Sequence, residues 1–196
     1  MRPKSLFFLN IVVAILVIAC NTPYIPKDKG YPAVSFPQKQ YLPYSDPSAP
    51  YSFEIPKYAS VNHEVNYFGV EKKSAAWMNL DFPVFNCTLY ISYNTIQKNQ
   101  FDTLLNDAYK FATNHANKAS SIEDSVFTTP LGVHGVFFHI GGDVATAYQF
   151  FLTDSTRHFF RGALYFNTTP NADSLAPYNA FLLEDVKHMV NTFRWK

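Results

Sequence analysis

The residues best able to do chemistry lie close together near one predicted turn. Asp154, Ser155 and His158 fall within five positions, and a histidine that takes the serine proton would make a hydrolase conceivable. A hairpin turn explains the same residues more simply, because Asp and Ser side chains hydrogen-bond their own backbone. The sequence also has no GxSxG motif, which many serine hydrolases carry. We therefore predict that the chain is not an enzyme.

Metal and nucleotide sites are not expected either. The six histidines include no HExxH motif and no pair at helical i,i+4 spacing, and they are His63, His115, His134, His139, His158 and His188. His134 and His139 are five positions apart, so on one strand they would point to opposite faces. Gly141-Gly142 lacks the further glycines of a phosphate-binding loop and is predicted to form a tight turn. No cofactor is predicted.

Charge and size limit the remaining classes of function. The chain has 196 residues, of which 47% are hydrophobic and 17% aromatic, enough for one folded domain. Its 16 basic and 15 acidic residues nearly cancel, which argues against nucleic-acid binding. If Cys20 carries lipid, Cys87 has no partner for a disulfide within the chain. Cys87 opens an apolar strand and is predicted to be a buried small hydrophobe.

The N-terminus has the pattern of an export signal. Arg2 and Lys4 precede a short apolar run, which predicts a signal peptide over residues 1–19. Residues 17–20 (Val-Ile-Ala-Cys) look like a lipobox, in which Cys20 is lipidated and becomes the mature N-terminus. The alternatives are an ordinary cleaved signal and an uncleaved anchor. No aspartate follows Cys20, so we expect a lipid-anchored protein of the cell envelope, on the outer membrane and facing the periplasm.

A proline-rich segment follows the expected anchor. Residues 20–50 carry seven prolines interleaved with aromatic residues, which predicts an extended tether, part of which docks on the domain. A single globular domain is predicted over residues 51–196. Its predicted strands are residues 51–55, 76–82, 88–93, 133–140, 145–153 and 157–166.

Two helices are predicted among these strands. Apolar residues recur at helical spacing over 101–115, after Asn99 as the N-cap, and again between residues 178 and 193, after Ser174 as the cap. In the last strand Phe160 and Leu164 point to one face and Arg161 and Tyr165 to the other, so both faces need cover. The predicted class is α+β, a six-stranded antiparallel sheet with one helix on each face.

A series of motifs in the mature chain resembles a known family. They are Lys29-Gly30-Tyr31-Pro32, Tyr51-Ser52-Phe53-Glu54-Ile55-Pro56, Ile140-Gly141-Gly142, Gln149-Phe150, Thr153-Asp154-Ser155, His158-Phe159-Phe160-Arg161-Gly162-Ala163-Leu164-Tyr165-Phe166, Pro170-Asn171-Ala172-Asp173-Ser174 and Trp195-Lys196. Together with the lipobox, this series resembles the gliding-motility lipoprotein GldD family. The resemblance implies a lipoprotein needed for surface gliding and for the linked type IX secretion apparatus, with no known enzymatic activity. The order of elements also resembles the PsbP-like and Mog1-like sandwich fold.

These observations favour an assembly or stabilising component whose partners are other envelope proteins of the gliding and type IX secretion machinery. The candidate partner-binding residues are Asp154, Ser155, His158, Arg161, Asn171 and Asp173. Arg161 is the first choice, since an arginine between aromatic residues can offer a bidentate contact at an interface. An ion pair from Arg161 to Asp173 within the chain is an equal alternative. A periplasmic ligand- or glycan-binding module is the second function, and a Ser155/His158 hydrolase the third.

Overall fold

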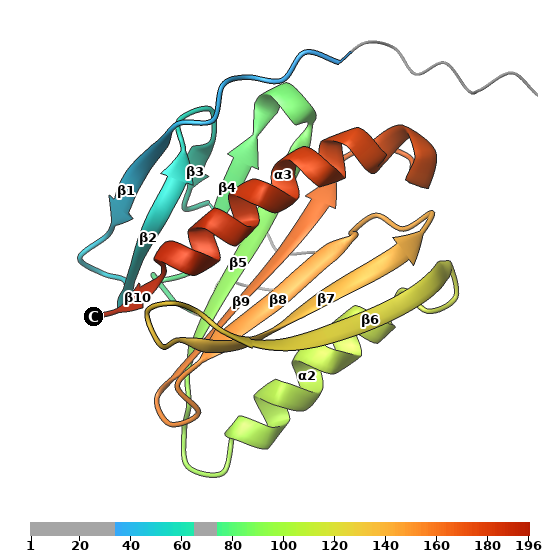
Figure 1. Ribbon diagram of the computed structural model, residues 1–196. Helices are drawn as coiled ribbons and strands as arrows, with labels where there is room; N and C mark the ends of the chain where they lie inside the picture. The colour runs from blue at the N-terminus through green and yellow to red at the C-terminus, as the bar shows by residue number, and fades with distance from the viewer. Residues whose placement is uncertain (1–33, 65–73) are drawn as a thin grey trace, which may run out of the picture. The chain divides into compact units, whose positions relative to one another are not determined.

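The folded part of the chain is built on an antiparallel sheet. The computed structural model describes residues 34–64 and 74–196, so the expected signal peptide and Cys20 lie outside the described residues. Within those ranges, seven strands form the main sheet in the order β3-β4-β5-β9-β8-β7-β6, and three more form a small sheet in the order β1-β2-β10 (Figure 1). Every neighbouring pair is antiparallel.

The element bounds are as follows. The main sheet contains β3 (Ser60–Asn62), β4 (Met78–Phe82), β5 (Cys87–Thr95), β6 (Ala119–Thr128), β7 (His134–Gly142), β8 (Tyr148–Thr153) and β9 (His158–Phe166). The small sheet contains β1 (Tyr41–Ser45), β2 (Tyr51–Pro56) and β10 (Arg194–Trp195). The helices are α2 (Phe101–Thr113) and α3 (Ala172–Thr192), and the short 3-10 turn η1 (Pro83–Phe85) joins β4 to β5.

The two helices cover opposite faces of the main sheet, as predicted. Phe160 and Leu164 of β9 enter the larger core together with Leu182 and Met189 of α3. Phe159, one residue along β9, enters a second core with Ala108 and Ala112 of α2. Alternation along a strand sends neighbouring side chains to opposite faces, so each face of the sheet has its own apolar layer. The α+β class is confirmed.

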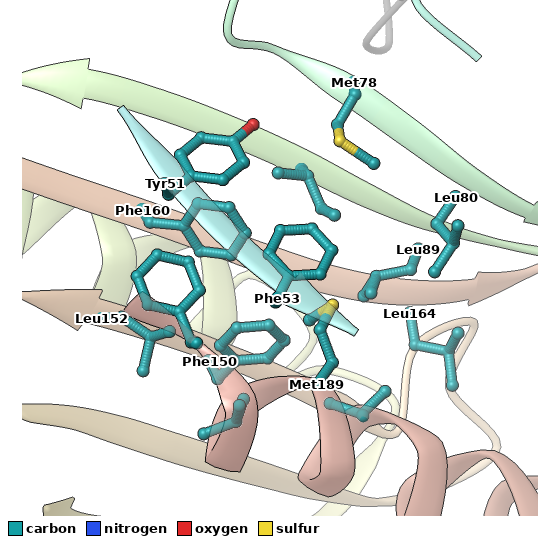
Figure 2. Close-up of a cluster of buried hydrophobic side chains, with 14 of the residues drawn as sticks. Tyr51, Phe53, Met78, Leu80, Leu89, Phe150, Leu152, Phe160, Leu164 and Met189 are labelled. Atoms are coloured by element: carbon teal, nitrogen blue, oxygen red, sulfur yellow. The ribbon is translucent and has the colours of Figure 1, made fainter. Parts of the chain in front are cut away.

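The small sheet belongs to the same core as α3. Tyr51 and Phe53 of β2 are buried beside Phe160 of β9, and Figure 2 shows their rings gathered with Met189 of α3. Phe193, directly after α3, lies 4.9 Å from the Phe160 ring in an edge-on arrangement. Aromatic contacts of this kind add about 0.5–1.5 kcal/mol each beyond area burial. The C-terminal end of the chain is thereby fixed to the sheet.

The predicted sheet of six strands is corrected to seven. The predicted strand 51–55 is β2 and belongs to the small sheet, while β3 and β6 join the main one. Strand β6 was not predicted because it lies at the sheet edge and most of its side chains are exposed, so its sequence is polar and lacks alternation. The hairpin across residues 83–86 is confirmed by β4 and β5.

Both predicted helix caps are wrong by one to three residues. Gln100 is the N-cap of α2, and Asn99 instead adopts a left-handed conformation with φ +62°, which asparagine tolerates. Asn171 caps α3, because its side chain accepts the backbone N–H of Ser174 at 2.8 Å. Neither described helix is long and apolar enough to cross a membrane.

Part of the proline-rich segment packs on the domain. Strand β1 pairs along β2, with Tyr41 opposite Pro56. The ring of Phe36 stacks on that of Phe181 of α3, with centroids 4.4 Å apart. The folded unit therefore includes residues from 34 onward, ahead of the predicted domain boundary at residue 51.

Candidate functional site

The turn between β8 and β9 holds three of the candidate residues. The Asp154 carboxylate accepts the backbone N–H groups of Thr156, Arg157 and His158 at 3.0, 2.8 and 2.8 Å. Partial burial raises the pKa of Asp154, but these hydrogen bonds outweigh it and bring the pKa to about 2. Ser155 has φ +62° and donates its backbone N–H to the Thr153 hydroxyl. The carboxylate therefore shapes the turn.

His158 is oriented by aromatic neighbours. Its Nδ1 lies 2.7 Å from the Tyr93 hydroxyl, and its ring stacks on Trp195 with centroids 4.9 Å apart. Burial lowers the pKa of His158 below its usual range, which favours the neutral imidazole at pH 7. In a serine hydrolase the carboxylate would orient the histidine ring and the histidine would contact the serine. Here Asp154 contacts backbone groups and His158 contacts Tyr93.

Arg161 lies deep on the face of the sheet that α2 covers. Its side chain is only 7% exposed, and it donates to the Gln149 side-chain oxygen at 2.7 Å. The guanidinium also lies 4.4 Å from the ring centre of Phe111 of α2. Such a stacked arginine joins helix to sheet through cation–π attraction and packing.

Asn171 and Asp173 lie at the start of α3, away from the turn. Asn171 is the N-cap, and Asp173 in the first turn interacts favourably with the positive end of the helix dipole. Strand β9 runs from His158 to Phe166 between the two places, a span of roughly 25 Å at about 3.3 Å per residue. The structure thus brings Asp154, Ser155 and His158 together. It separates them from Asn171 and Asp173.

A buried ionic cluster ties the segment before β1 to α3. Asp185 is 2% exposed and accepts hydrogen bonds from Lys39 at 2.8 Å, from Tyr41 at 2.8 Å and from Tyr58. Burial, then the hydrogen bond to Asp185, raises the pKa of both Tyr41 and Tyr58. Lys39 also donates to the Phe181 carbonyl at 2.7 Å. Sequence reasoning missed this cluster, since Lys39 and Asp185 are 146 positions apart.

A groove of about 610 Å³ lies between α3 and the edge of the sheet formed by β6 and β7. It is lined by Ser125, Phe127, Thr128, Phe137, His139, Tyr148, Leu183, Lys187, Val190 and Asn191. The rings of His139 and Tyr148 stack within it, with centroids 5.3 Å apart. Its volume is in the range of small-ligand sites, and stacked rings with polar groups at the rim suit sugars or peptides. Apart from the alternation in β7, no local sequence pattern predicts this groove.

The groove is open because of the way α3 is placed. Leu182, Val186 and Met189 point into the core, while Leu183 and Lys187 point toward β6 and β7. The helix therefore covers the middle of the sheet and leaves the β6 edge uncovered on this face.

Among the described residues, no group of three histidine, cysteine or acidic side chains is placed to hold a metal ion.

Comparison with known proteins gives a fold and a family. No curated protein matches this chain. The solution structure of cyanobacterial PsbP (CyanoP) from Synechocystis sp. PCC 6803 aligns with a TM-score of 0.50 at 10% identity, covering 84% of this chain and 98% of that one. At this identity the likeness shows the fold alone, and it confirms the predicted PsbP-like architecture. The family model described as gliding motility lipoprotein GldD matches residues 21–195, nearly all of the sequence after the predicted lipobox. The chain therefore belongs to the gliding motility lipoprotein GldD family.

Proposed function

We propose that this lipoprotein is a non-catalytic assembly or stabilising component of the gliding machinery and the linked type IX secretion apparatus. In this proposal Cys20 carries the lipid anchor, and the folded body faces the periplasm from the outer membrane. The family match over residues 21–195 is the observation that carries the proposal. Durable attachment is expected from two or more acyl chains, since each buried methylene adds about 0.8 kcal/mol.

The β8–β9 turn supports a role without catalysis. The Asp154 oxygen accepts three backbone N–H groups, and the His158 ring is fixed by Tyr93 and Trp195. These contacts give each side chain a structural role. They differ from a proton relay, in which the carboxylate would contact the histidine and the histidine would contact the serine. Ser155 is exposed at the tip of the turn and remains a candidate for contact with a partner.

Complementation in a gliding bacterium that carries this gene tests the proposal. Deletion is expected to abolish surface gliding and to retain type IX cargo inside the cell. Ser155→Ala and His158→Gln are each expected to restore gliding and secretion to the level of the wild-type gene. Normal gliding of the deletion strain would contradict the machine-component role. Loss of gliding in both Ser155→Ala and His158→Gln, with each protein present at normal level, would instead favour the hydrolase, whereas loss in Ser155→Ala alone would favour a partner contact at Ser155.

The groove keeps a second function open, binding of a ligand or glycan. Tyr148 and Phe137 line it, with ring centroids 5.8 Å apart, and Lys187 and Asn191 add polar groups to the lining. Titration of the purified protein with peptidoglycan fragments and with lipopolysaccharide core saccharides tests this role. Binding that is lost in Tyr148→Ala would support it, and absence of binding to either probe would remove it.

A further inference from the structure

Strand β6 is the long edge of the main sheet, and its outer side has no neighbouring strand among the described residues. It spans ten residues, whereas β3 at the opposite edge spans three. Figure 1 shows β6 as the outermost strand, beyond β7. A strand of this length exposes a row of backbone donors and acceptors that another chain can pair with.

The hydrogen-bond pattern shows which residues direct their backbone outward. Thr129 donates its N–H to the Val133 carbonyl at 2.8 Å where β6 turns into β7. Hydrogen-bonded pairs alternate along an antiparallel ladder, so in the observed register Phe127 and Ser125 bond β7. Asp124 and Val126 then direct their N–H and C=O groups away from the sheet.

The side chains beside this free edge are unusual for a strand that only faces water. Val126 is 80% exposed, the most exposed of the large hydrophobic residues described. On the other face of β6, Phe127 and Ser125 form one wall of the groove beneath α3. A strand added at the edge would set one apolar side chain beside Val126 and another beside Phe127, at the mouth of the groove.

The charges on β6 indicate whether the added strand comes from a second copy of this chain or from another protein. Glu123 and Asp124 are both exposed at the centre of β6. Glu123 and Asp124 point to opposite faces of the sheet, and twofold antiparallel pairing of β6 with a second copy, centred on the strand, would set one of these carboxylates directly opposite its own copy on the same face, which is unfavourable. A strand with basic side chains at the matching positions would instead form opposite-charge pairs.

From these observations, and resting on the proposed role as a machine component, we propose that β6 receives an extended segment of another envelope protein by strand addition. The segment carries one or two basic side chains facing Glu123 and Asp124, flanked by apolar side chains facing Val126 and Phe127. The backbone supplies the affinity, and the acidic pair with the groove supplies the selectivity.

Site-specific photocrosslinking in the native host tests the proposal. A photoreactive benzoylphenylalanine is placed at Val126 in the full-length protein, and at Val84, which is 69% exposed on η1, as the matched control position. We expect a discrete adduct with a different protein from position 126 only. Combining this probe with Glu123→Lys and Asp124→Lys should weaken the adduct about tenfold, because two favourable charge pairs become unfavourable.

Three outcomes would overturn the proposal. They are an adduct with a second copy of this chain, an adduct of equal strength from position 84, and an adduct that the charge reversal leaves unchanged. The proposed function has its own separate test. A deletion strain that glides normally would remove that function, whereas the crosslinking result reports on the edge alone.

A proline variant checks the backbone contribution. Val126→Pro removes an N–H that points outward, so the ladder to β7 is kept, and proline is tolerated at edge strands in this orientation. We expect gliding to be lost in Val126→Pro and kept in Val126→Thr, with equal protein levels and equal melting temperatures. Normal gliding of a folded Val126→Pro protein would overturn strand addition. If Val126→Pro does not fold, the variant with Glu123→Lys and Asp124→Lys replaces it in the gliding test, and it is likewise expected to lose gliding.

Discussion

At the scale of single residues, Asp185 shows how the segment before β1 is held. Its side chain is 1% exposed, and the Lys39 ammonium 2.8 Å away is 22% exposed. Tyr41 donates to the same carboxylate oxygen as Lys39, and Tyr58 donates to the other oxygen. Removing either the carboxylate or its cation is expected to destabilise the protein strongly, since a buried group is then left without its partner.

Asp185→Ala is expected to lower the free energy of unfolding by about 3 kcal/mol, because it leaves Lys39 and two tyrosine hydroxyls without their acceptor. Glu184→Ala is the matched control. Its side chain is 68% exposed and lies 3.5 Å from Lys39, so it should cost about 0.5 kcal/mol or less. Urea denaturation of the purified proteins measures both. Equal losses would show that the buried cluster does not hold the segment.

Asp154 gives a prediction that depends on pH. Its pKa is about 2 in the folded protein and near 3.9 in an unfolded chain, so its stabilising effect is complete above pH 4 and is lost toward pH 2. Asp154→Asn should therefore be less stable than the wild type by about 2 kcal/mol at pH 6. The gap should shrink as the pH falls from 4 to 2. A gap that stays constant over this range would mean that the charge of Asp154 plays no part.

At the scale of elements, β8 and β9 approach each other across Gly162. A β-carbon added at Gly162 would lie 2.4 Å from two atoms of the Phe150 ring. Phe150 in turn stacks on Phe137, with centroids 6.1 Å apart, next to the groove. The small size of residue 162 is thus what allows the Phe150 ring to lie against β9 at this position.

Gly162→Ala is expected to destabilise the protein by about 1–3 kcal/mol through overpacking. Phe150→Leu frees part of the space, so Gly162→Ala should cost less in that background, a positive coupling of at least about 0.5 kcal/mol. Thermal denaturation of the two single variants and the double variant completes the cycle. Strict additivity would contradict the close packing of residue 162 against the ring.

Most elements were predictable because their apolar residues follow the period of a helix or a strand. The strands β7, β8 and β9 and both helices fall close to the predicted ranges. Strand β1 contains Pro43, which a central strand would exclude but an edge strand accepts. The cap of α3 differs because Asn171 and Ser174 are both good N-cap residues and the local sequence does not rank them. The cap of α2 differs because Gln100 takes the N-cap position without a side-chain hydrogen bond, while Asn99 takes the left-handed conformation before it.

At the scale of the whole molecule, contacts between residues far apart in the sequence produce features that local sequence patterns do not predict. The groove depends on how α3 lies across the sheet, and no local pattern contains that placement. Arg161 was predicted as a partner contact from its aromatic neighbours, but the fold buries it against Gln149 and Phe111. The adjacency of Asp154, Ser155 and His158 could be predicted, since one turn contains all three.

The position of the domain boundary determines how far the chain can be shortened without loss of stability. A chain of residues 34–196 contains every described element. A chain of residues 51–196 lacks β1, Phe36 and Lys39, and should be less stable by at least about 3 kcal/mol, because the buried Asp185 loses its cation. Differential scanning calorimetry compares the two. Equal stability of the shorter chain would place the boundary at residue 51.

The proposed function requires that the folded body, without enzymatic activity, is held at the membrane by lipid on Cys20. The gliding speed of a deletion strain that carries Cys20→Ser tests this requirement, with incorporation of radiolabelled palmitate followed in the same cells. We expect no incorporation into the variant and no gliding, although the protein is made at normal level. A Cys20→Ser strain that glides at wild-type speed with no label on the protein would contradict it.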